Sequence, residues 1–325
     1  MMRRILYISP GGIGNLVMAI PALRSVRAAY PQAQITLLTA EPGVNLILDN
    51  EGLIDGVVTV DRSAPAVKAL VNTIRGQAFD CAMTAGTVNP LSAGALMWLS
   101  GIPLRAGENI GGRGFFYTRK VEYAPLCHER DGALNIVEAL GIEPVSLFPD
   151  LRITGEEQNS AENFLNRHGW KPGQILAGIH PGSAFRAAKQ KRWPAQNFIQ
   201  VIKRLHQKQF KVLLAAGPAE QSLAKEIAQA AGGNVINTNA ELSLRATAAA
   251  IQFCRGFISN DSGIAHIAAA VATPLVVLFG PTEPLRVAPK GKKVIVLQTP
   301  KAGPVSGIGV EEVTGAIEKI CGQRE

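Results

Sequence analysis

The chain has 325 residues, 47% hydrophobic and 18% charged, which is long enough for about two domains and excludes a disordered protein. Its 33 Lys and Arg residues outnumber its 25 Asp and Glu residues, and the net charge of +8 favours an anionic partner such as a nucleotide, a phosphorylated glycan or an acidic membrane. No motif for nucleic-acid binding accompanies this charge. The four cysteines form no Cys-x-x-Cys pair, which argues against a zinc or redox site and leaves buried or neutral thiols.

The N-terminus imitates a secretory signal, because Arg3 and Arg4 precede apolar residues. Pro10 and the glycines that follow it interrupt the continuous apolar core that such a signal needs. The longest apolar stretch, 264–280, contains His266 and Pro274 and is too short to span a bilayer comfortably. We therefore expect a cytoplasmic protein without a transmembrane segment.

In the first half of the chain, short β-rich runs alternate with helical runs. Strands are expected over 4–8, 35–39, 57–60 and 79–83, and a helix over 15–30 has its apolar residues on one face. This alternation predicts right-handed βαβ units and a parallel sheet. The middle, 105–173, is less regular.

Two helices are expected in this middle segment. One covers 132–140 and the other 154–167, where Thr154 and Glu157 fit a capping box.

The strand–helix pattern restarts at residue 175. The expected strands are 175–179, 211–215, 256–259 and 275–278, and the expected helices are 195–207, 219–230, 242–253, 262–270 and 310–320. We predict an α/β protein of two Rossmann-like, doubly wound parallel-sheet domains, 1–165 and 166–325, facing a cleft. It stays open whether the final helix, 310–321, packs back on the first domain.

The loop Ser9–Asn15 follows the first expected strand and contains Gly11, Gly12 and Gly14. Glycines let the backbone approach a ligand, and the next helix offers unpaired N–H groups. Gly12 and Gly14 fit a G-x-G-x-x-G fingerprint, but Val17 holds its third position, although Glu41 lies where a ribose-binding acid would be. A tight turn without a ligand is an equal alternative.

Two further loops follow strands of the second half. His180–Ser183 precedes the cations Lys189, Lys191 and Arg192, a pattern that suits a phosphate group, although an exposed basic loop is the more common explanation of such a charge run. After the next strand, Glu220 is placed either to bind a ribose or to complement a helix dipole as a first-turn acid.

The loop Ser259–His266 is the most polar cluster between apolar runs. Asp261 or Ser262 can cap the following helix, whose first amide groups form a ready anion site, and His266 lies one turn further on. Thr282 belongs to a turn on the same rim. An N-cap beside a packed histidine is the simpler alternative.

Taken together, these loops resemble glycosyltransferase family 9, the ADP-heptose heptosyltransferases. The matching segments are GGIGNLVMAIPALRSVRAAYPQAQITLLT, HPGS, KRWPAQNF, AAGPAEQSLAKEI and SNDSGIAHIAAAVATPLVVLFGPTEP. The resemblance implies a GT-B fold, with the acceptor held mainly by the first domain and the nucleotide-sugar by the second. It also implies inverting transfer without a metal or cofactor, and the chain contains no Asp-x-Asp motif.

The resemblance also assigns roles to residues. Lys191 matches the lysine that stabilises the leaving diphosphate, and Asp261 matches the acid that contacts the donor sugar. The remaining donor-side matches are Ser183, Glu220, Leu242, Ser262, Gly263, His266 and Thr282, and the acceptor-side loop carries Gly11, Gly12 and Gly14. The implied acceptor is an anionic lipid-linked glycan of the lipopolysaccharide-core type, reached by a monomer with peripheral contact to the inner membrane.

One position departs from the family. The residue after Gly14 is usually aspartate, the presumed general base, and here it is Asn15, whose amide cannot take up a proton. Either Glu108, His128 or Glu129 replaces the base, or transfer is slower and relies on positioning, or the protein binds without transferring. Because losing a base costs about 10²–10⁴-fold, Asn15 alone does not exclude catalysis.

Several basic residues of the middle segment are hypothesised to face the anionic acceptor, with a solvated basic surface as the alternative. They are Arg105, Arg113, Arg119, Lys120, His128 and Arg130. A nucleotide-sugar epimerase and a non-catalytic nucleotide-sugar-binding or glycan-binding protein stay open as other functions. A nicotinamide oxidoreductase ranks last because the dinucleotide fingerprint is incomplete.

Overall fold

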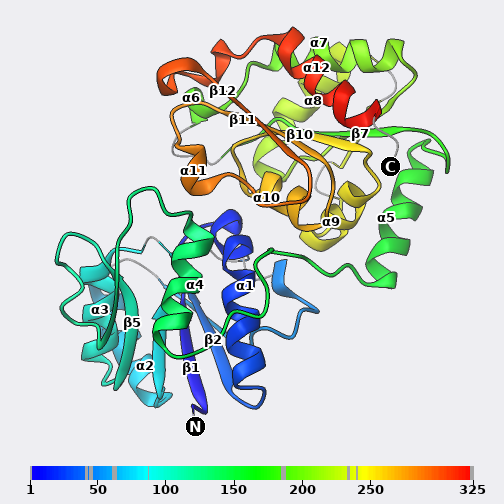
Figure 1. The fold of residues 1–325 in the computed structure, drawn as a ribbon. Helices are drawn as coiled ribbons and strands as arrows, with labels where there is room; N and C mark the ends of the chain where they lie inside the picture. The colour runs from blue at the N-terminus through cyan, green and yellow to red at the C-terminus, as the bar shows by residue number, and fades with distance from the viewer. Residues whose placement is uncertain are drawn as a thin grey trace. The chain divides into compact units, whose positions relative to one another are not determined.

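The computed structural model describes residues 2–40, 43, 47–60, 64–86, 88–183, 188–232, 235–238 and 241–322. The chain forms two compact units, residues 1–149 and 150–325. The division lies earlier than the boundary at 165 that the sequence suggested. Helix α5 (Gly155–Arg167) packs against α9 (Leu244–Gln252) of the second unit, which explains the difference (Figure 1).

The N-terminal unit, residues 1–149, is built on one parallel sheet of six strands in the order β3-β2-β1-β4-β5-β6. The strands are β1 Arg4–Ile8, β2 Gln34–Thr39, β3 Gly56–Thr59, β4 Cys81–Thr84, β5 Leu104–Asn109 and β6 Arg119–Glu122. The helices are α1 Ile13–Ala29, α2 Ala64–Gly76, α3 Pro90–Leu99 and α4 Glu129–Ala139, and α1 packs against α4. The central strands are almost entirely buried, as helices on both faces of a parallel sheet require.

The C-terminal unit, residues 150–325, repeats this architecture with the order β12-β11-β10-β7-β8-β9. Its strands are β7 Leu176–His180, β8 Lys211–Leu214, β9 Val235–Asn237, β10 Gly256–Asn260, β11 Leu275–Phe279 and β12 Val294–Gln298. Besides α5 and α9 its helices are α6 Ala188–Lys191, α7 Ala195–Gln207, α8 Gln221–Ala231, α10 Gly263–Ala270, α11 Pro284–Val287 and α12 Val310–Gly322, with short 3₁₀ turns η3 Pro218–Glu220, η4 Pro300–Ala302 and η5 Val305–Gly307. Helix α12 packs on α7, β10 and β11 of its own unit.

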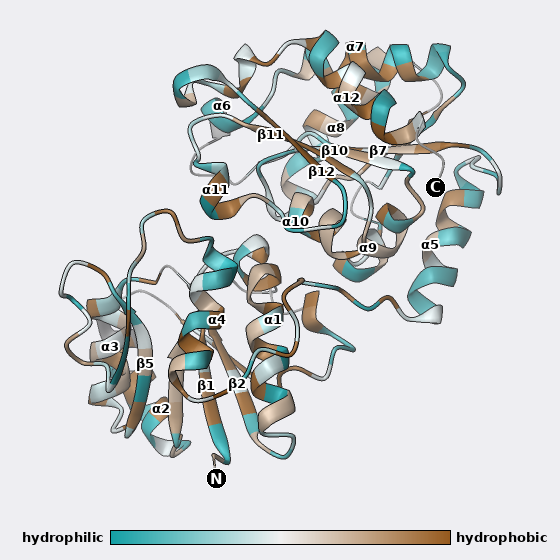
Figure 2. Cartoon of the chain, in the orientation of Figure 1, coloured by the Kyte–Doolittle hydropathy of each residue, from teal (hydrophilic) through white to brown (hydrophobic). Residues whose placement is uncertain are grey.

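Each sheet reverses its strand order at one point, between β1 and β4 in the first unit and between β7 and β10 in the second. All the strand pairs are parallel, so the carboxyl ends of these strands open onto the same edge. Ligands of doubly wound sheets bind at such reversal points. Figure 2 shows the hydrophobic strands inside each unit and the two-faced helices that cover them.

The expected elements of the doubly wound pattern are present, with boundaries shifted by a few residues. The description of the middle as irregular was incomplete, because β5 and β6 lie there. Their sequences, LRAGEN and RKVE, carry charges that conceal a strand pattern. The expected capping box of α5 is confirmed: Thr154 Oγ1 accepts from the Glu157 amide at 3.2 Å, and the Glu157 carboxylate accepts from the Thr154 amide at 2.9 Å.

Two further expectations concern membranes and thiols. Among the described residues, no helix is both long and apolar enough to cross a bilayer. Burial raises the pKa of the Cys81 thiol to about 12 and that of the Cys321 thiol to about 11, so both stay protonated.

Candidate functional site

Lys191 and Asp261 form an ion pair where the strand order of the C-terminal unit reverses. Lys191 ends α6, in the segment after β7, and Asp261 directly follows β10. The ammonium donates to Asp261 Oδ2 at 2.7 Å, and only 22% of the lysine side chain and 10% of the aspartate side chain are exposed. The two residues are 70 positions apart in sequence, and the parallel register of β7 and β10 brings them together.

Asn260, the last residue of β10, fixes the loops around this pair. Its fully buried amide donates to the carbonyls of Pro181 at 2.8 Å and Gly182 at 3.1 Å, and its Oδ1 accepts from the Trp193 amide at 3.1 Å. One side chain therefore holds the loop after β7 and the segment after α6 against the end of β10. Buried polar groups satisfied in this way specify one local arrangement.

Trp193 and Gly280 also fix the position of the segment that carries Lys191. The Trp193 indole is 2% exposed, donates to the Ile308 carbonyl at 2.9 Å and packs edge-on against Phe198. A Cβ at Gly280 would lie 2.8 Å from the Gln190 carbonyl oxygen, so glycine is needed for β11 to end this close to α6.

Ser183 and Ser262 line the approach to Asp261 through backbone contacts. Ser183 Oγ donates to the Asp261 carbonyl at 3.2 Å, and Arg192 donates to the Ser183 carbonyl at 3.2 Å. Ser262 is the N-cap of α10, accepting from the Ala265 amide at 3.4 Å. Gly263 is the first residue of that helix, whose leading amides and dipole make an anion-binding end beside Lys191 and Asp261.

His180, Gly182 and Glu220 pack together where the loops after β7 and β8 meet. His180 Nδ1 lies 2.8 Å from the Ala215 carbonyl, and burial lowers the pKa of the imidazole, partly offset by that hydrogen bond and by Glu220. A Cβ on Gly182 would come within 2.8 Å of both Glu220 and His180. Glu220 Oε2 accepts from the Gly217 amide at 3.1 Å, so Glu220 serves as the first-turn acid of η3.

The other donor-side residues lie around this rim. His266 is buried in α10, Thr282 is half-buried after β11, and Leu242 is half-buried just before α9. The roles of Leu242 and Thr282 stay predictions. The side chain of Lys189 and the whole of Glu41 lie outside the described residues.

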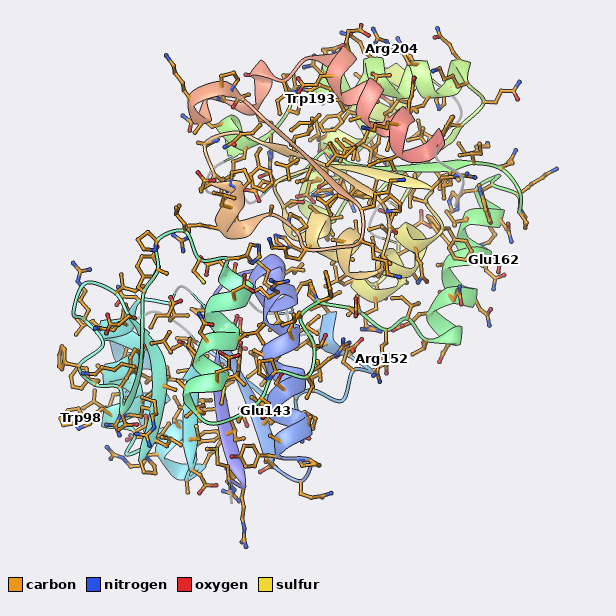
Figure 3. The ribbon with its side chains drawn as sticks, viewed as in Figure 1. Trp98, Glu143, Arg152, Glu162, Trp193 and Arg204 are labelled. Carbon is orange, nitrogen blue, oxygen red and sulfur yellow. The ribbon has the colours of Figure 1, made fainter. Side chains whose placement is uncertain are left out.

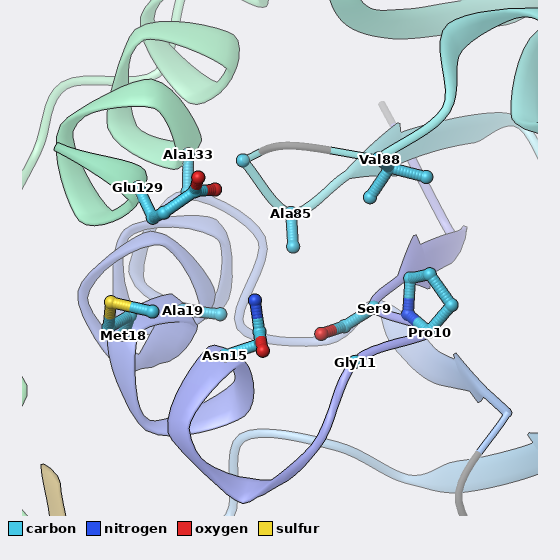
Figure 4. Close-up of a pocket in the computed structure, with 11 residues that line it drawn as sticks. Ser9, Pro10, Gly11, Asn15, Met18, Ala19, Ala85, Val88, Glu129 and Ala133 are labelled. Atoms are coloured by element: carbon cyan, nitrogen blue, oxygen red, sulfur yellow. The ribbon is translucent and has the colours of Figure 1, made fainter. Parts of the chain in front are cut away.

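A second candidate site is the pocket where the strand order of the N-terminal unit reverses (Figure 4). It encloses about 160 Å³. The lining residues come from the loops after β1 and β4 and from α1 and α4: Ser9, Pro10, Gly11, Asn15, Met18, Ala19, Ala85, Gly86, Val88, Glu129 and Ala133. Gly11 and Asn15 of the predicted acceptor-side loop lie in it, while Gly12 is the N-cap of α1 and Gly14 lies in its first turn.

The three candidate replacements for the missing base are in different environments. Glu129, the first residue of α4, lines the pocket together with Asn15. His128 is buried, and its ring nitrogen accepts from the Arg130 amide at 3.1 Å as the N-cap of α4. Glu108 is buried in β5, where its carboxylate would meet a Cβ on Gly132 at 2.5 Å. Neither His128 nor Glu108 lines the pocket.

The basic residues of the middle segment divide into two groups. Arg105 donates to the carbonyls of Phe116 at 2.7 Å and Ile102 at 2.6 Å, and Arg130 pairs with Asp131, so both hold the fold. Arg113, Arg119 and Lys120 are exposed. Within the described residues, no three His, Cys, Asp or Glu side chains form a cluster that could hold a metal ion.

Sequence reasoning missed Asn260 and Ser9 as functional positions. Both stand at the carboxyl end of a strand that borders a reversal point, and that position is the signal that could have found them. Asn260 is a buried polar residue at the end of β10, and Ser9 is a buried polar residue directly after β1.

Comparison with known proteins places the chain in a family. The model of glycosyltransferase family 9 (heptosyltransferase) matches residues 67–306. Lipopolysaccharide heptosyltransferase 2 of Escherichia coli (strain K12) is 27% identical over 317 residues, which cover 91% of this chain and 88% of that protein.

Solved structures share the two-unit GT-B fold. The glycosyl transferase family 9 from Veillonella parvula DSM 2008 superposes with a TM-score of 0.83 at 23% identity, covering 98% of this chain and 97% of that one. The E. coli heptosyltransferase WaaC with ADP gives a TM-score of 0.76 at 21% identity, covering 98% and 99%. Because the family model spans most of the chain, the chain belongs to glycosyltransferase family 9, the heptosyltransferase family.

Proposed function

We propose that the protein transfers a heptose from ADP-heptose, with inversion and without a metal ion, to a lipopolysaccharide-core or related glycan. Family membership makes it a glycosyltransferase, and the proposal adds the donor, the acceptor and the chemistry. The observation that carries it is the Lys191–Asp261 ion pair beside the N-terminus of α10.

This site has the groups that a nucleotide-sugar donor requires. The leaving ADP develops negative charge as the bond to the sugar breaks, and Lys191 and the first amides of α10 are donors held in place to receive it. The Asp261 carboxylate can accept hydrogen bonds from sugar hydroxyls. The donor identity rests on the relatives, which include a heptosyltransferase solved with ADP.

The same lysine supports the proposal that transfer needs no metal ion. In metal-dependent transfer a divalent cation neutralises the departing diphosphate, and here the ammonium supplies a fixed positive charge at the corresponding place. The burial of the pair strengthens this field, because a partly buried charge is screened less than an exposed one.

We also propose that the N-terminal unit approaches its lipid-linked acceptor at an anionic membrane surface. Trp98 of α3 stacks on Phe116 at 5.3 Å between ring centroids, and Phe116 contacts Phe115 at 4.2 Å. Trp98 is 53% exposed and Phe115 59%, and Figure 3 shows Trp98 at the periphery of its unit. Helix α3 carries no charged residue, while the neighbouring loop and strand β6 add exposed Arg113 and Arg119. Exposed aromatic rings beside cations fit an anionic bilayer interface.

The experiment is a transfer assay with ADP-heptose and heptose-deficient lipopolysaccharide, followed by mass spectrometry. Wild-type protein should add one heptose to the acceptor, and Lys191→Ala should lower kcat roughly 10²-fold or more, as loss of a transition-state donor does. Lys203→Ala, which removes an exposed lysine from α7, is the matched control and should keep wild-type activity.

The same assay separates the other functions. Conversion of the sugar with donor alone would indicate an epimerase. Donor binding with no transfer to any acceptor would indicate a non-catalytic binding protein and contradict the proposal.

A further inference from the structure

The pocket of the N-terminal unit contains a buried hydroxyl that no residue of the described chain satisfies. Ser9 is 1% exposed, lines the pocket, and its Oγ makes no hydrogen bond within the described residues. Figure 4 shows this oxygen pointing into the pocket, toward the side where Asn15 stands. Because a buried hydroxyl without a partner costs free energy, such a group in a site is one that a ligand satisfies.

Asn15 adds a second polar group to this pocket. It is the third residue of α1, and its side chain folds over Gly11, where a Cβ would lie 2.6 Å from the Asn15 amide. Glycine at position 11 therefore sets the direction of the amide. An amide both donates and accepts hydrogen bonds, so Asn15 can orient a hydroxyl but cannot take its proton.

Glu129 adds the group that can take the proton. Among the described residues that line the pocket, it carries the one carboxylate. Its approach depends on Gly86, because a Cβ there would lie 2.8 Å from Glu129 Oε2 and 2.6 Å from the Glu129 carbonyl oxygen. The glycine after β4 thus leaves room for the start of α4 to bring the carboxylate into the pocket.

The volume fits part of a sugar. The pocket encloses about 160 Å³, well above the roughly 10–15 Å³ of such space that one water needs, so it has room for a hydroxyl-bearing part of a sugar. Three polar side chains from one loop and two helices meet in that space, and apolar Met18, Ala19 and Ala133 form part of its wall.

We propose that this pocket binds the reacting hydroxyl of the sugar acceptor, with Ser9 and Asn15 positioning the hydroxyl and Glu129 acting as the general base in place of the absent aspartate. The inference rests on the proposed transferase function. The acceptor oxygen forms a bond to the anomeric carbon while the bond from that carbon to the diphosphate oxygen breaks. The leaving diphosphate keeps the bonding electron pair, and the acceptor proton passes to the Glu129 carboxylate.

The test uses Glu129→Gln, Asn15→Asp and the double variant in the transfer assay. Glu129→Gln should lower kcat about 10²–10⁴-fold, the usual effect of losing a general base, with ADP-heptose affinity within about twofold of wild type. It should also remove the low-pH limb of the kcat profile. The double variant with Asn15→Asp should have a kcat at least tenfold higher than that of Glu129→Gln alone, because the new carboxylate enters the same pocket.

Two controls separate catalysis from folding. Glu143→Gln removes an exposed carboxylate of the same unit and should leave kcat unchanged. Ser9→Ala removes the unsatisfied hydroxyl, so the melting temperature should not fall, while KM for the acceptor rises several-fold. A merely structural serine would instead lower the melting temperature and leave KM unchanged.

The outcomes distinguish this inference from the function on which it rests. If wild-type protein transfers heptose and Glu129→Gln keeps kcat within threefold, the base assignment is wrong and the proposed function stands. A loss of activity in Glu129→Gln that Asn15→Asp does not restore also overturns the assignment. If wild-type protein binds ADP-heptose but transfers nothing, both the function and the base are overturned.

Discussion

Lys191 and Asp261 show how much of the site single residues reveal. Their residue types and loop positions suit a diphosphate and a sugar, but an exposed basic loop and an N-cap explain the same residues. The resemblance to the family is what selected them from the sequence. Their contact at 2.7 Å became visible only in the fold, because pairing across 70 residues depends on the sheet.

Asn260 and Ser9 were missed in the sequence for a different reason. Asn260 acts through three backbone groups that belong to two other segments, and none of these is near in sequence. Ser9 is notable because its hydroxyl has no hydrogen-bond partner in the part of the chain that the structure describes, and only a structure shows that a group is buried and unsatisfied.

His180 leads to a prediction about pH and stability. Burial lowers the pKa of its imidazole from the ordinary value of 6.5. As the pH falls through 6.5, the unfolded chain therefore binds the proton before the folded protein does. The contribution of His180 to the free energy of unfolding is present above pH 6.5 and is lost as the pH falls toward the folded-state pKa.

The measurement is urea unfolding of wild-type protein and His180→Gln between pH 7.5 and 5. The wild-type free energy of unfolding should fall more steeply, by up to about 1.4 kcal/mol more per pH unit, the slope of one proton. His168→Gln, at a histidine whose side chain is 35% exposed, is the control and should keep the wild-type slope. Equal slopes in His180→Gln and wild-type protein would contradict this account of His180.

At the scale of elements, most central strands and the long helices were predictable, whereas β5 and the edge strands β6, β9 and β12 were not. Strands β1, β2, β10 and β11 are rich in apolar residues and almost entirely buried because helices cover both faces. Strands β5, β6, β9 and β12 contain charged or half-exposed residues, or are too short to form a pattern. Helix α5 was expected but was assigned to the first domain. The sequence of the helix alone does not predict that it packs on α9.

Asn260 joins the end of β10 to two neighbouring segments, so its loss should affect both stability and donor binding. Asn260→Ala removes hydrogen bonds at 2.8, 3.1 and 3.1 Å and leaves buried carbonyls without donors. The free energy of unfolding of the C-terminal unit should fall by about 2–4 kcal/mol. Donor affinity should fall as well, because the segment with Lys191 loses its anchor.

Urea unfolding and ADP titration measure the two effects, with Asn166→Ala on the exposed side of α5 as the control. A variant with wild-type stability and wild-type ADP affinity would show that Asn260 does not hold the site together.

At the scale of the whole molecule, the two doubly wound sheets of the GT-B fold followed from the strand–helix alternation. The alternation does not predict which apolar residues are exposed on the surface. The sequence of α3, PLSAGALMWL, is typical of a buried helix. The structure leaves Leu91, Trp98 and Leu99 of that helix exposed.

The exposed aromatic surface around Trp98 and Phe115 gives a prediction for the intact protein. Wild-type protein should co-sediment with vesicles of phosphatidylglycerol and phosphatidylethanolamine, and less so as salt is added, because the charge attraction is screened. Trp98→Ser with Phe115→Ser should weaken binding at least tenfold, whereas Leu285→Ser, at an exposed leucine of the other unit, should not. Binding that is unaffected by the double substitution would exclude this surface as the membrane contact.

The measurement that tests the central claim most directly is calorimetric titration of the protein with ADP and with ADP-heptose. Wild-type protein should bind both ligands. Lys191→Ala should weaken both by roughly tenfold or more, because both carry the diphosphate. Asp261→Asn should weaken ADP-heptose relative to ADP, because only the former presents sugar hydroxyls, and Lys203→Ala should change neither. If wild-type protein binds neither ligand, or if Lys191→Ala and Asp261→Asn bind both as wild type does, the donor site is not where the Lys191–Asp261 pair lies.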